Sequence, residues 1–413
     1  MRVNMYKVFL IYFFTSLLCI QPSFSQEDKL NTTINTAFNS KNALGLQNNL
    51  RTQNKSIINY NLQYSKKKFS SQVSLNFDDD GNLNFDNSYV NYKKGITNLN
   101  IGKVDRIWSF SKKSSLILSS NGRPLEVISI KLDNKFNTQW LSPTANWSAE
   151  VINGYTNASL IGSLNGERSM LSGIRVIISP SEKLNFEFLQ VSQWGDQTDK
   201  IYSPKIDNFL FRDTNIGANA DINRLAGFGV SYSKSFNENF YRSYIQTIGE
   251  DEAGSLPSCL SWLTGIEFTA PEIKFPTTVT LEAIDTRVKK STNGNCGQNT
   301  MYNNKNYGYV NYDTVIGVPI DTEGTSIELF GKTQISQKIN IKYSTKYLTI
   351  NDKDWSSHRL SSKRETGLVS SLGISWKSNN LTLGINIYNQ DYILDKAKIN
   401  NSTGLGFFST ITF

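Results

Sequence analysis

The chain has 413 residues, with 43 lysines and arginines against 35 aspartates and glutamates, a formal net charge of +8, and a hydrophobic fraction of only 38%. Much of the basic excess lies in short clusters, such as the lysines at 66–68 and 93–94, which is typical of charged turns and not of a nucleic-acid-binding surface. After residue 25 no apolar run reaches the length of a membrane-spanning helix, which excludes a helical membrane protein.

The first predicted element is a secretory signal peptide over residues 1–25. Arg2 and Lys7 precede an apolar stretch at 8–20, and Ser25 supplies the small residue of a cleavage site. The apolar stretch is shorter than the ~20 residues that a membrane anchor needs. Cleavage leaves 388 residues, and the loss of Arg2 and Lys7 lowers the net charge from +8 to +6.

Segments with a period of two recur along the rest of the chain, without a long helical stripe. They predict about eighteen antiparallel strands, at 42–50, 54–63, 69–77, 84–92, 97–104, 125–132, 144–153, 170–178, 183–193, 224–234, 239–248, 260–269, 276–286, 325–333, 338–348, 366–377, 380–390 and 403–413. We expect an all-β fold, a transmembrane outer-membrane β-barrel over 42–413, because an even strand number returns both chain ends to the periplasm. Residues 26–41 are polar and are expected to form a short periplasmic lead-in.

The last segment, LGFFSTITF, shows the alternation most clearly. One face carries Leu405, Phe407, Ile411 and Phe413, and the other carries Gly406, Thr410 and Thr412. A terminal aromatic residue and this pattern are typical of the final strand of an outer-membrane barrel, apolar toward lipid and polar toward the lumen. The last strand of a soluble sandwich is the alternative.

The connections between the predicted strands differ in length on the two sides. With Phe413 placed in the periplasm, the connections on the periplasmic side are short: SNN, QISQK, SFNEN, SPSEK, LSPT and KKG. The connections on the external side are mostly long, at 105–124, 154–169, 194–223, 249–259, 287–324 and 349–365. This asymmetry is typical of bacterial outer-membrane barrels with long extracellular loops.

The predicted external loops contain the candidate binding residues. Glu250, Asp251 and Glu252 concentrate negative charge, which suits a cation, acid/base chemistry or pairing with arginines of a neighbouring loop. Two other loops combine aromatic and acidic residues, among them Trp194, Asp196, Tyr302, Tyr307, Tyr309 and Tyr312. Such side chains stack on sugar rings and hydrogen-bond sugar hydroxyls, and they also build aromatic girdles and loop networks.

The sequence offers little for catalysis. His358 is the only histidine, so a Ser-His or Cys-His mechanism has to use it. There is no glycine-rich phosphate loop, no CxxC pair and no histidine-rich metal set. We therefore expect no catalytic residue, metal or cofactor, with a lipid hydrolase acting through His358 as the enzymatic alternative. Cys259 and Cys296 are the two cysteines left after cleavage, and an oxidising compartment favours a disulfide between them.

Five stretches in family order resemble the Wzi family of capsule assembly proteins: GKVDRIWSFSKKSSLILSSNGRP at 102–124, SGIRVIISPSEKLNFEFLQVSQWGD at 172–196, RLAGFGVSYS at 224–233, IGEDEAGSLPS at 248–258 and YGYVNYDTVIGVPIDTEGTS at 307–326. The chain departs from the family pattern where Ser109 and Phe110, instead of Gly-Pro, follow Trp108. The resemblance implies an eighteen-stranded outer-membrane barrel that holds capsular polysaccharide at the bacterial surface.

The predicted function is a non-enzymatic barrel that binds capsular or extracellular polysaccharide through its external loops, in a lectin-like way, and helps to assemble or anchor it. The candidate binding or loop-bracing residues are Asp105, Arg106, Trp108, Arg123, Trp194, Asp196, Glu250, Asp251 and Glu252. Arg106 and Arg123 either meet acidic sugars or pair with the acidic residues at 250–252. The expected partners are polysaccharide, outer-membrane lipid and the polysaccharide export machinery, with no nucleic acid. A porin or substrate-selective channel is the alternative.

Overall fold

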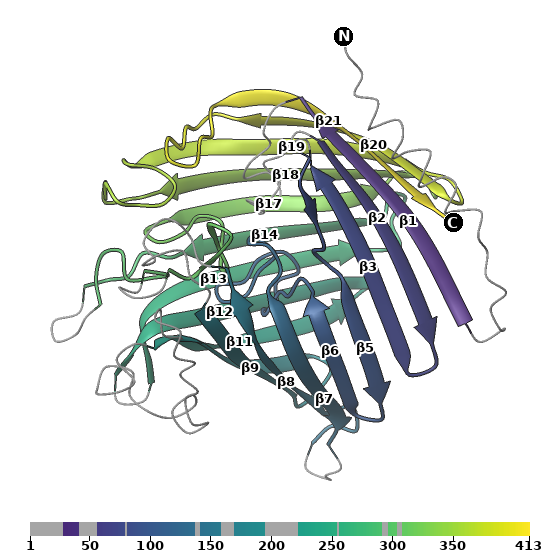
Figure 1. Ribbon diagram of the computed structural model, residues 1–413, viewed down its shortest axis with the longest axis horizontal. Coiled ribbons are helices and arrows are strands. Elements are labelled where there is room, and N and C mark those ends of the chain that lie inside the picture. The colour runs from purple at the N-terminus through teal and green to yellow at the C-terminus, as the bar shows by residue number, and fades with distance from the viewer. Residues whose placement is uncertain are drawn as a thin grey trace.

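The described part of the protein is one antiparallel β-barrel and contains no helix (Figure 1). The computed structural model describes residues 28–40, 56–78, 81–136, 141–157, 169–194, 222–253, 256–290, 296–303 and 308–413. The sheet has nineteen strands, but β4 (Leu83–Asn84) is only a two-residue piece beside the end of β3, so eighteen strands build the wall. The expected fold class and strand number are confirmed.

The wall strands follow one another around the barrel in chain order. Their bounds are β1 Asp28–Asn39, β2 Ser56–Lys66, β3 Phe69–Asp78, β5 Tyr89–Lys94, β6 Thr97–Lys103, β7 Glu126–Lys135, β8 Asn146–Thr156, β9 Ser169–Ser179, β10 Leu184–Trp194, β11 Asn223–Phe236, β12 Asn239–Ala253, β13 Leu256–Ala270, β14 Thr277–Asp285, β17 Thr325–Gln334, β18 Ile339–Ile350, β19 Glu365–Lys377, β20 Leu381–Gln390 and β21 Ser402–Thr412. A small hairpin of β15 (Val310–Asn311) and β16 (Thr314–Val315) lies in the loop between β14 and β17. In the described ranges, no helix is long and apolar enough to cross a membrane.

The first wall strand corrects the periplasmic lead-in expected at 26–41. β1 pairs with β2 on one side and with β21 on the other, from Thr33 opposite Thr412 to Asn39 opposite Gly406, so it closes the barrel. The segment looks polar because a lumen-facing strand surface needs no apolar side chains. The strand predicted at 42–50 lies outside the described residues, and the other seventeen predicted strands each overlap an observed one.

The wall has an apolar outer face and a polar inner face. Large apolar side chains that point outward remain about half exposed, for example Ile128 at 52%, Ile266 at 60%, Ile327 at 57% and Phe407 at 52%. Their sequence neighbours face the lumen and are mostly buried or polar. An apolar belt of this kind meets the hydrocarbon of a membrane, as the alternation in the last strand predicts.

The two ends of the barrel differ. β1 begins and β21 ends at the end where the connections are short, such as 67–68, 95–96, 180–183, 237–238 and 378–380, and the long connections lie at the other end (Figure 1). We call these the short-turn end and the long-loop end. In outer-membrane barrels they face the periplasm and the outside, respectively.

The hydrophobic core fills the lumen toward the long-loop end. The loop at 104–125 and the described residues of the loop before β17 (286–290, 296–303 and 308–324) turn inward, and we call them together the plug. Their buried residues, such as Leu116, Ile117, Tyr302 and Tyr309, belong to one cluster with lumen-facing wall residues, including Ile152, Leu171, Val191, Leu225, Ile248 and Leu263. The side chains that normally form a domain core are therefore supplied here by loops and wall together.

Candidate functional site

The stretch DRIWSFSKKSSLILSSNGRP forms the first half of the plug. Its apolar run, Leu116, Ile117 and Leu118, is at most 3% exposed. The backbone is pinned from the wall, because Gln246 of β12 accepts a hydrogen bond from the Leu116 amide at 2.9 Å and donates one to the Trp108 carbonyl at 2.6 Å. This run therefore packs inside the mouth of the barrel and does not face lipid.

Trp108 is part of the core and not a sugar-stacking surface. It is 1% exposed, and its indole Nε1 donates a hydrogen bond to Glu150 of β8 at 3.2 Å. Its ring also lies against Gly173 of β9, where a Cβ atom would come within 2.9 Å of it. A glycine is needed at this position because the tryptophan occupies the space of a side chain.

Arg106 and Arg123 brace the plug through Glu150 and Asp86 and not through Glu250. Arg106 donates from Nε to Glu150 at 3.1 Å and from Nη2 to the Ser129 hydroxyl at 3.0 Å. Arg123 makes a two-pronged ion pair with Asp86, at 2.8 and 2.9 Å, and its guanidinium lies 4.0 Å from the ring centre of Tyr312. Pairing with Glu250, part of one of the two alternatives, is wrong, because Arg106 and Arg123 meet Glu150 and Asp86 instead.

The space between these two arginines is too small for a sugar. Asp105 accepts a hydrogen bond from the Asn87 amide at 3.1 Å, and its own backbone N–H donates to Asn87 at 3.1 Å. The cavity lined by Asp105, Arg106 and Arg123 measures only about 20 Å³, which is room for a water molecule.

The acidic stretch GEDEAGSLPSC is mostly strand and not a loop. β12 runs to Ala253 and β13 begins at Leu256, so the expected loop at 249–259 is an extension of the β12–β13 hairpin. The Glu250 carboxylate accepts a hydrogen bond from the backbone N–H of Tyr302. The side chains of Asp251 and Glu252 lie outside the described part of the structure, although their backbones pair with β13.

The two predicted residues of the loop after β10 are described only in part. Trp194 is the last residue of β10, and its backbone lies opposite Met170 of β9. Its side chain and all of Asp196 lie outside the described residues. Both remain predicted binding residues.

Two of the predicted loop tyrosines join the halves of the plug. The rings of Tyr302 and Tyr309 stack with centres 5.6 Å apart, and their hydroxyls donate to the carbonyls of Leu116 and Ile117 at 2.6 and 2.7 Å. Both side chains are fully buried, and burial raises the pKa of each phenol. They are therefore unavailable to a sugar. Tyr312 contacts Arg123, and Tyr307 lies outside the described residues.

Beneath the plug, the inner wall carries charged residues that the sequence analysis did not single out. Arg175 of β9 pairs with Glu187 of β10 at 2.6 Å, and Arg242 of β12 pairs with Glu267 of β13 at 3.2 Å. The same arginines donate to plug carbonyls, of Ser109 at 3.0 Å and Phe110 at 2.8 Å. Their charged side chains on lumen-facing strand positions were a signal that could have identified them.

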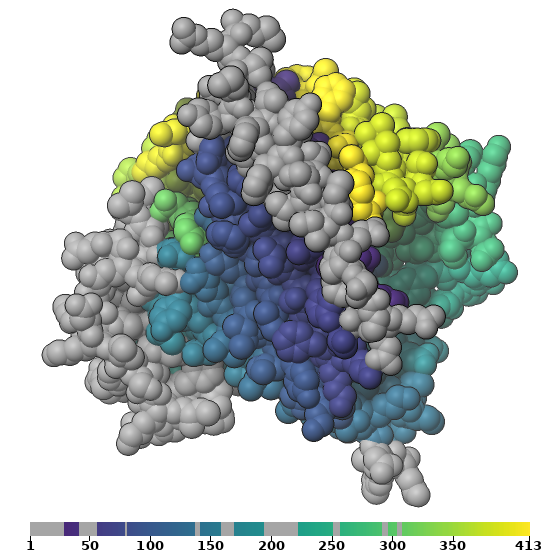
Figure 2. Space-filling view, turned by 45° about the vertical axis from the view of Figure 1, so that its right-hand side comes forward, coloured from purple at the N-terminus to yellow at the C-terminus, as the bar shows by residue number. Residues whose placement is uncertain are grey.

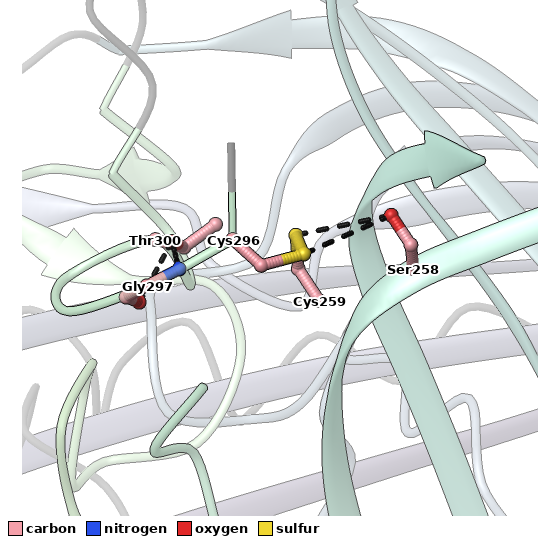
Figure 3. The surroundings of a disulfide bond; sticks show 5 residues. All are labelled: Ser258, Cys259, Cys296, Gly297 and Thr300. Atoms are coloured by element: carbon pink, nitrogen blue, oxygen red, sulfur yellow. Dashed lines mark hydrogen bonds between the residues drawn. A yellow bond between two sulfur atoms is a disulfide. The ribbon is translucent and has the colours of Figure 1, made fainter. Parts of the chain in front are cut away.

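A disulfide between Cys259 of β13 and Cys296 ties the second half of the plug to the wall (Figure 3). Cys296 is followed by a tight turn in which the Thr300 hydroxyl donates to the Gly297 carbonyl at 2.8 Å. In Figure 3 the bond spans the space between this turn and the β13 strand, with Ser258 beside the sulfur atoms. The second half of the plug is therefore fixed covalently to β13.

His358 has a structural position in the loop between β18 and β19. It is fully buried, its Nδ1 accepts the Leu360 N–H at 3.1 Å, and its Nε2 therefore donates to the Thr322 carbonyl at 3.0 Å. Burial lowers the pKa of this imidazole. Beside it, Arg359 donates from Nε to Asp321 at 2.8 Å. Both ring nitrogens are thus engaged by backbone, which leaves neither one directed at a nucleophile.

The exposed charges of the long-loop end gather around Asp352. This carboxylate lies 3.8 Å from Arg287, 3.3 Å from Lys353 and 3.4 Å from Arg364, whose side chains are 42%, 57% and 53% exposed. Asp285 also pairs with Arg287, at 2.8 Å. Glu323 lies close enough to act on Arg287 and Lys353 as well. We call Arg287, Lys353 and Arg364 the basic rim, because they are the exposed cations that surround Asp352. In the described part of the chain, no three His, Cys, Asp or Glu side chains gather as a metal site.

A closed antiparallel barrel with an apolar outer belt and inward-folded loops defines an outer-membrane β-barrel whose long-loop end is filled by its own chain. Within this class, residues 18–390 match the family described as capsule assembly protein Wzi. The chain therefore belongs to that family, as the resemblance predicts.

Individual relatives are more distant. An uncharacterized 55.8 kDa protein in the cps region of Klebsiella pneumoniae is 29% identical over 204 residues, 47% of this chain and 38% of the relative, so the match spans well under half of that protein. The structure of Escherichia coli Wzi, an outer-membrane protein involved in group 1 capsule assembly and a carbohydrate-binding β-barrel, superposes with a TM-score of 0.73 at 19% identity, over 98% of this chain and 88% of that one. Pseudomonas aeruginosa OprD gives a TM-score of 0.53 at 8% identity, over 95% and 96%. These two likenesses concern the fold alone.

Proposed function

We propose that this protein binds a capsular or other extracellular polysaccharide at the long-loop end and helps to assemble or anchor it at the cell surface. Membership of the capsule assembly family supports the proposal, as does the relative in a Klebsiella cps region. The carbohydrate-binding activity of the E. coli barrel of the same fold points in the same direction.

The observation that carries the proposal is the construction of the plug. Its loops are fixed by a fully buried apolar cluster, by the Arg106–Glu150 and Arg123–Asp86 ion pairs and by the Cys259–Cys296 disulfide. A loop held in this way presents a rigid outer surface, and a rigid surface loses less conformational entropy when it binds a ligand. A porin needs the same space for an open path, so this alternative has less support.

The basic rim is the proposed contact for the polysaccharide. Its cations keep about half of their side-chain surface exposed, so their outer N–H groups stay accessible to a ligand. Arginine forms two-pronged hydrogen bonds with carboxylates, which makes an acidic polysaccharide the fitting ligand. Arg106, Arg123 and Trp108 then act indirectly, by holding the plug beneath the surface. Trp194, Asp196, Asp251 and Glu252 stay candidate contacts.

The proposed role is non-enzymatic, because the only histidine serves the loop backbone. The apolar belt meets outer-membrane lipid. Proteins of the polysaccharide export machinery are proposed partners, since a surface anchor has to receive its polysaccharide from them.

Deletion of the gene tests this function directly. We expect polysaccharide to shift from the cell-attached to the shed fraction, and the wild-type protein to restore attachment. A rim variant, Arg287→Gln with Lys353→Gln and Arg364→Gln, should restore it poorly. The matched control removes three lysines at the short-turn end, Lys67→Gln, Lys94→Gln and Lys338→Gln, and should restore it fully. Unchanged attachment in the deletion strain, together with strong conductance of the purified protein in planar bilayers, would favour the porin.

A further inference from the structure

The barrel lumen contains a second feature, separate from the basic rim. A cavity of about 540 Å³ lies beneath the plug, beside the strands that close the barrel. Its lining includes Lys113 of the plug and Phe330, Lys342, Ser371, Asn386 and Phe408 of β17 to β21. Lys342 lies near the start of β18, so the cavity extends toward the short-turn end. Figure 2, which turns this end toward the viewer, shows the molecule hollowed there. The volume is in the range of small-molecule sites.

The cavity is positively charged. Two lysines, Lys113 and Lys342, contribute to its lining, and no carboxylate does. Just behind it, Glu328 is paired with both Lys113 and Lys346, the latter at 3.0 Å, and Glu282 also lies close enough to act on Lys113. Lys342 forms no ion pair within the described part of the chain. Because the surrounding wall has a low dielectric constant, the ammonium group of Lys342 attracts an anion into the cavity.

The uncharged lining suits a polyhydroxylated molecule. Ser371 and Asn386 point polar groups into the cavity and make no side-chain hydrogen bond to any described residue. Phe330 and Phe408 supply aromatic surface. Hydroxyl and amide groups hydrogen-bond sugar hydroxyls, and aromatic rings pack on the apolar faces of sugar rings.

We propose that this cavity binds a carboxylated sugar, which enters from the short-turn end. The ammonium group of Lys342 pairs with the sugar carboxylate, Asn386 and Ser371 hydrogen-bond the ring hydroxyls, and Phe330 and Phe408 contact the ring. The site differs from the basic rim in residues and in position. Neither proposal depends on the other.

Titration calorimetry on the purified mature protein in detergent tests the site, with D-galacturonate as the probe and D-galactose as its neutral counterpart. We expect saturable binding of galacturonate and at least about tenfold weaker binding of galactose, because a charged hydrogen bond is lost. Lys342→Gln should weaken galacturonate binding by a similar factor. Lys338→Gln, in the short turn before β18 and outside the cavity, is the matched control and should leave it unchanged.

A second variant, Asn386→Asp, keeps the shape of the side chain but adds a negative charge to the cavity from another strand, and it should also weaken binding at least tenfold. Absence of saturable galacturonate binding, or an unaltered affinity in both cavity variants, would overturn the proposal. Equal affinity for inorganic sulfate and galacturonate would reduce the cavity to an unselective anion site, which also overturns it. The rim variant should bind galacturonate normally, so the two proposals fail independently.

Discussion

The bracing role of Arg123 can be tested by changing Asp86, its ion-pair partner, while Arg123 itself is kept. The guanidinium makes two hydrogen bonds to Asp86 at 2.8 and 2.9 Å and stacks on Tyr312 at 4.0 Å. Asp86→Asn removes the opposite charge without changing the shape of the side chain. If Arg123 holds the plug, this change at a buried residue loosens residues 104–125.

The size of the effect follows from the exposure of the pair. Removing one partner of a fully buried ion pair costs about 3–5 kcal/mol, whereas an exposed pair contributes about 0.2–1 kcal/mol. The side chains of Arg123 and Asp86 are 25% and 12% exposed, which places this pair between the two cases. We expect a loss of about 2 kcal/mol, which corresponds to about a 30-fold increase in opening of the plug.

Hydrogen exchange of the backbone amides at 104–125 measures this opening. Asp86→Asn and Arg123→Met should each speed exchange, and the double variant should be less affected than the sum of the two, because the interaction can be lost only once. Arg364→Met, an exposed rim residue, is the control and should leave exchange at 104–125 unchanged. Additive effects, or an Asp86→Asn variant with wild-type exchange, would show that Arg123 does not brace the plug.

Three further predictions concern the remaining ties of the plug. Alkylation of Cys259 and Cys296 should require prior reduction, and Cys296→Ser should speed exchange at 296–303; alkylation of the unreduced protein would contradict the disulfide. Burial lowers the pKa of His358 below its unfolded value near 6.5. As the pH falls through about 6.5, the imidazole is therefore protonated more readily in the open loop than in the closed loop, which favours opening. Hydrogen exchange at 351–364, corrected for the intrinsic rate, should rise. His358→Gln should abolish that pH dependence, and an equal slope in both proteins would refute the assignment. Trp108→Ala removes a fully buried ring and should lower the stability of the plug by about 3–5 kcal/mol. In planar bilayers the low conductance of the protein should then give way to frequent channel openings, whereas the exposed control Lys353→Ala should leave conductance low. A Trp108→Ala protein without openings would mean that the plug does not block the pore.

The strand pattern was readable from the sequence because it is a local property. Each wall strand separates two solvents, so apolar and polar side chains alternate along it whatever its partner. The exception, β1, shows the limit of this reasoning. Its lumen-facing Thr33, Asn35 and Asn39 reduce the average hydrophobicity, and only pairing with β21 identifies it as a wall strand.

The inward packing of SLILS was also predictable, since an apolar run in a loop needs a surface that excludes water. The partners of the plug were not. Arg106 meets Glu150, which is 44 residues away, and Arg123 meets Asp86, which is 37 residues away in the opposite direction along the chain. Nothing in the local sequence distinguishes these carboxylates from Glu250, because all lie on segments predicted to reach the same end of the barrel.

The sequence by itself therefore determined the barrel and the end at which its long loops lie, because side-chain alternation and loop length are properties of neighbouring residues. Only the tertiary structure decided that the candidate sugar-binding residues Trp108, Arg106 and Arg123 are internal supports, and that a charged cavity lies beneath them. The physical reason is that barrel closure and strand stagger bring together side chains from distant strands, and these long-range neighbours determine which charges are paired and which remain free for a ligand.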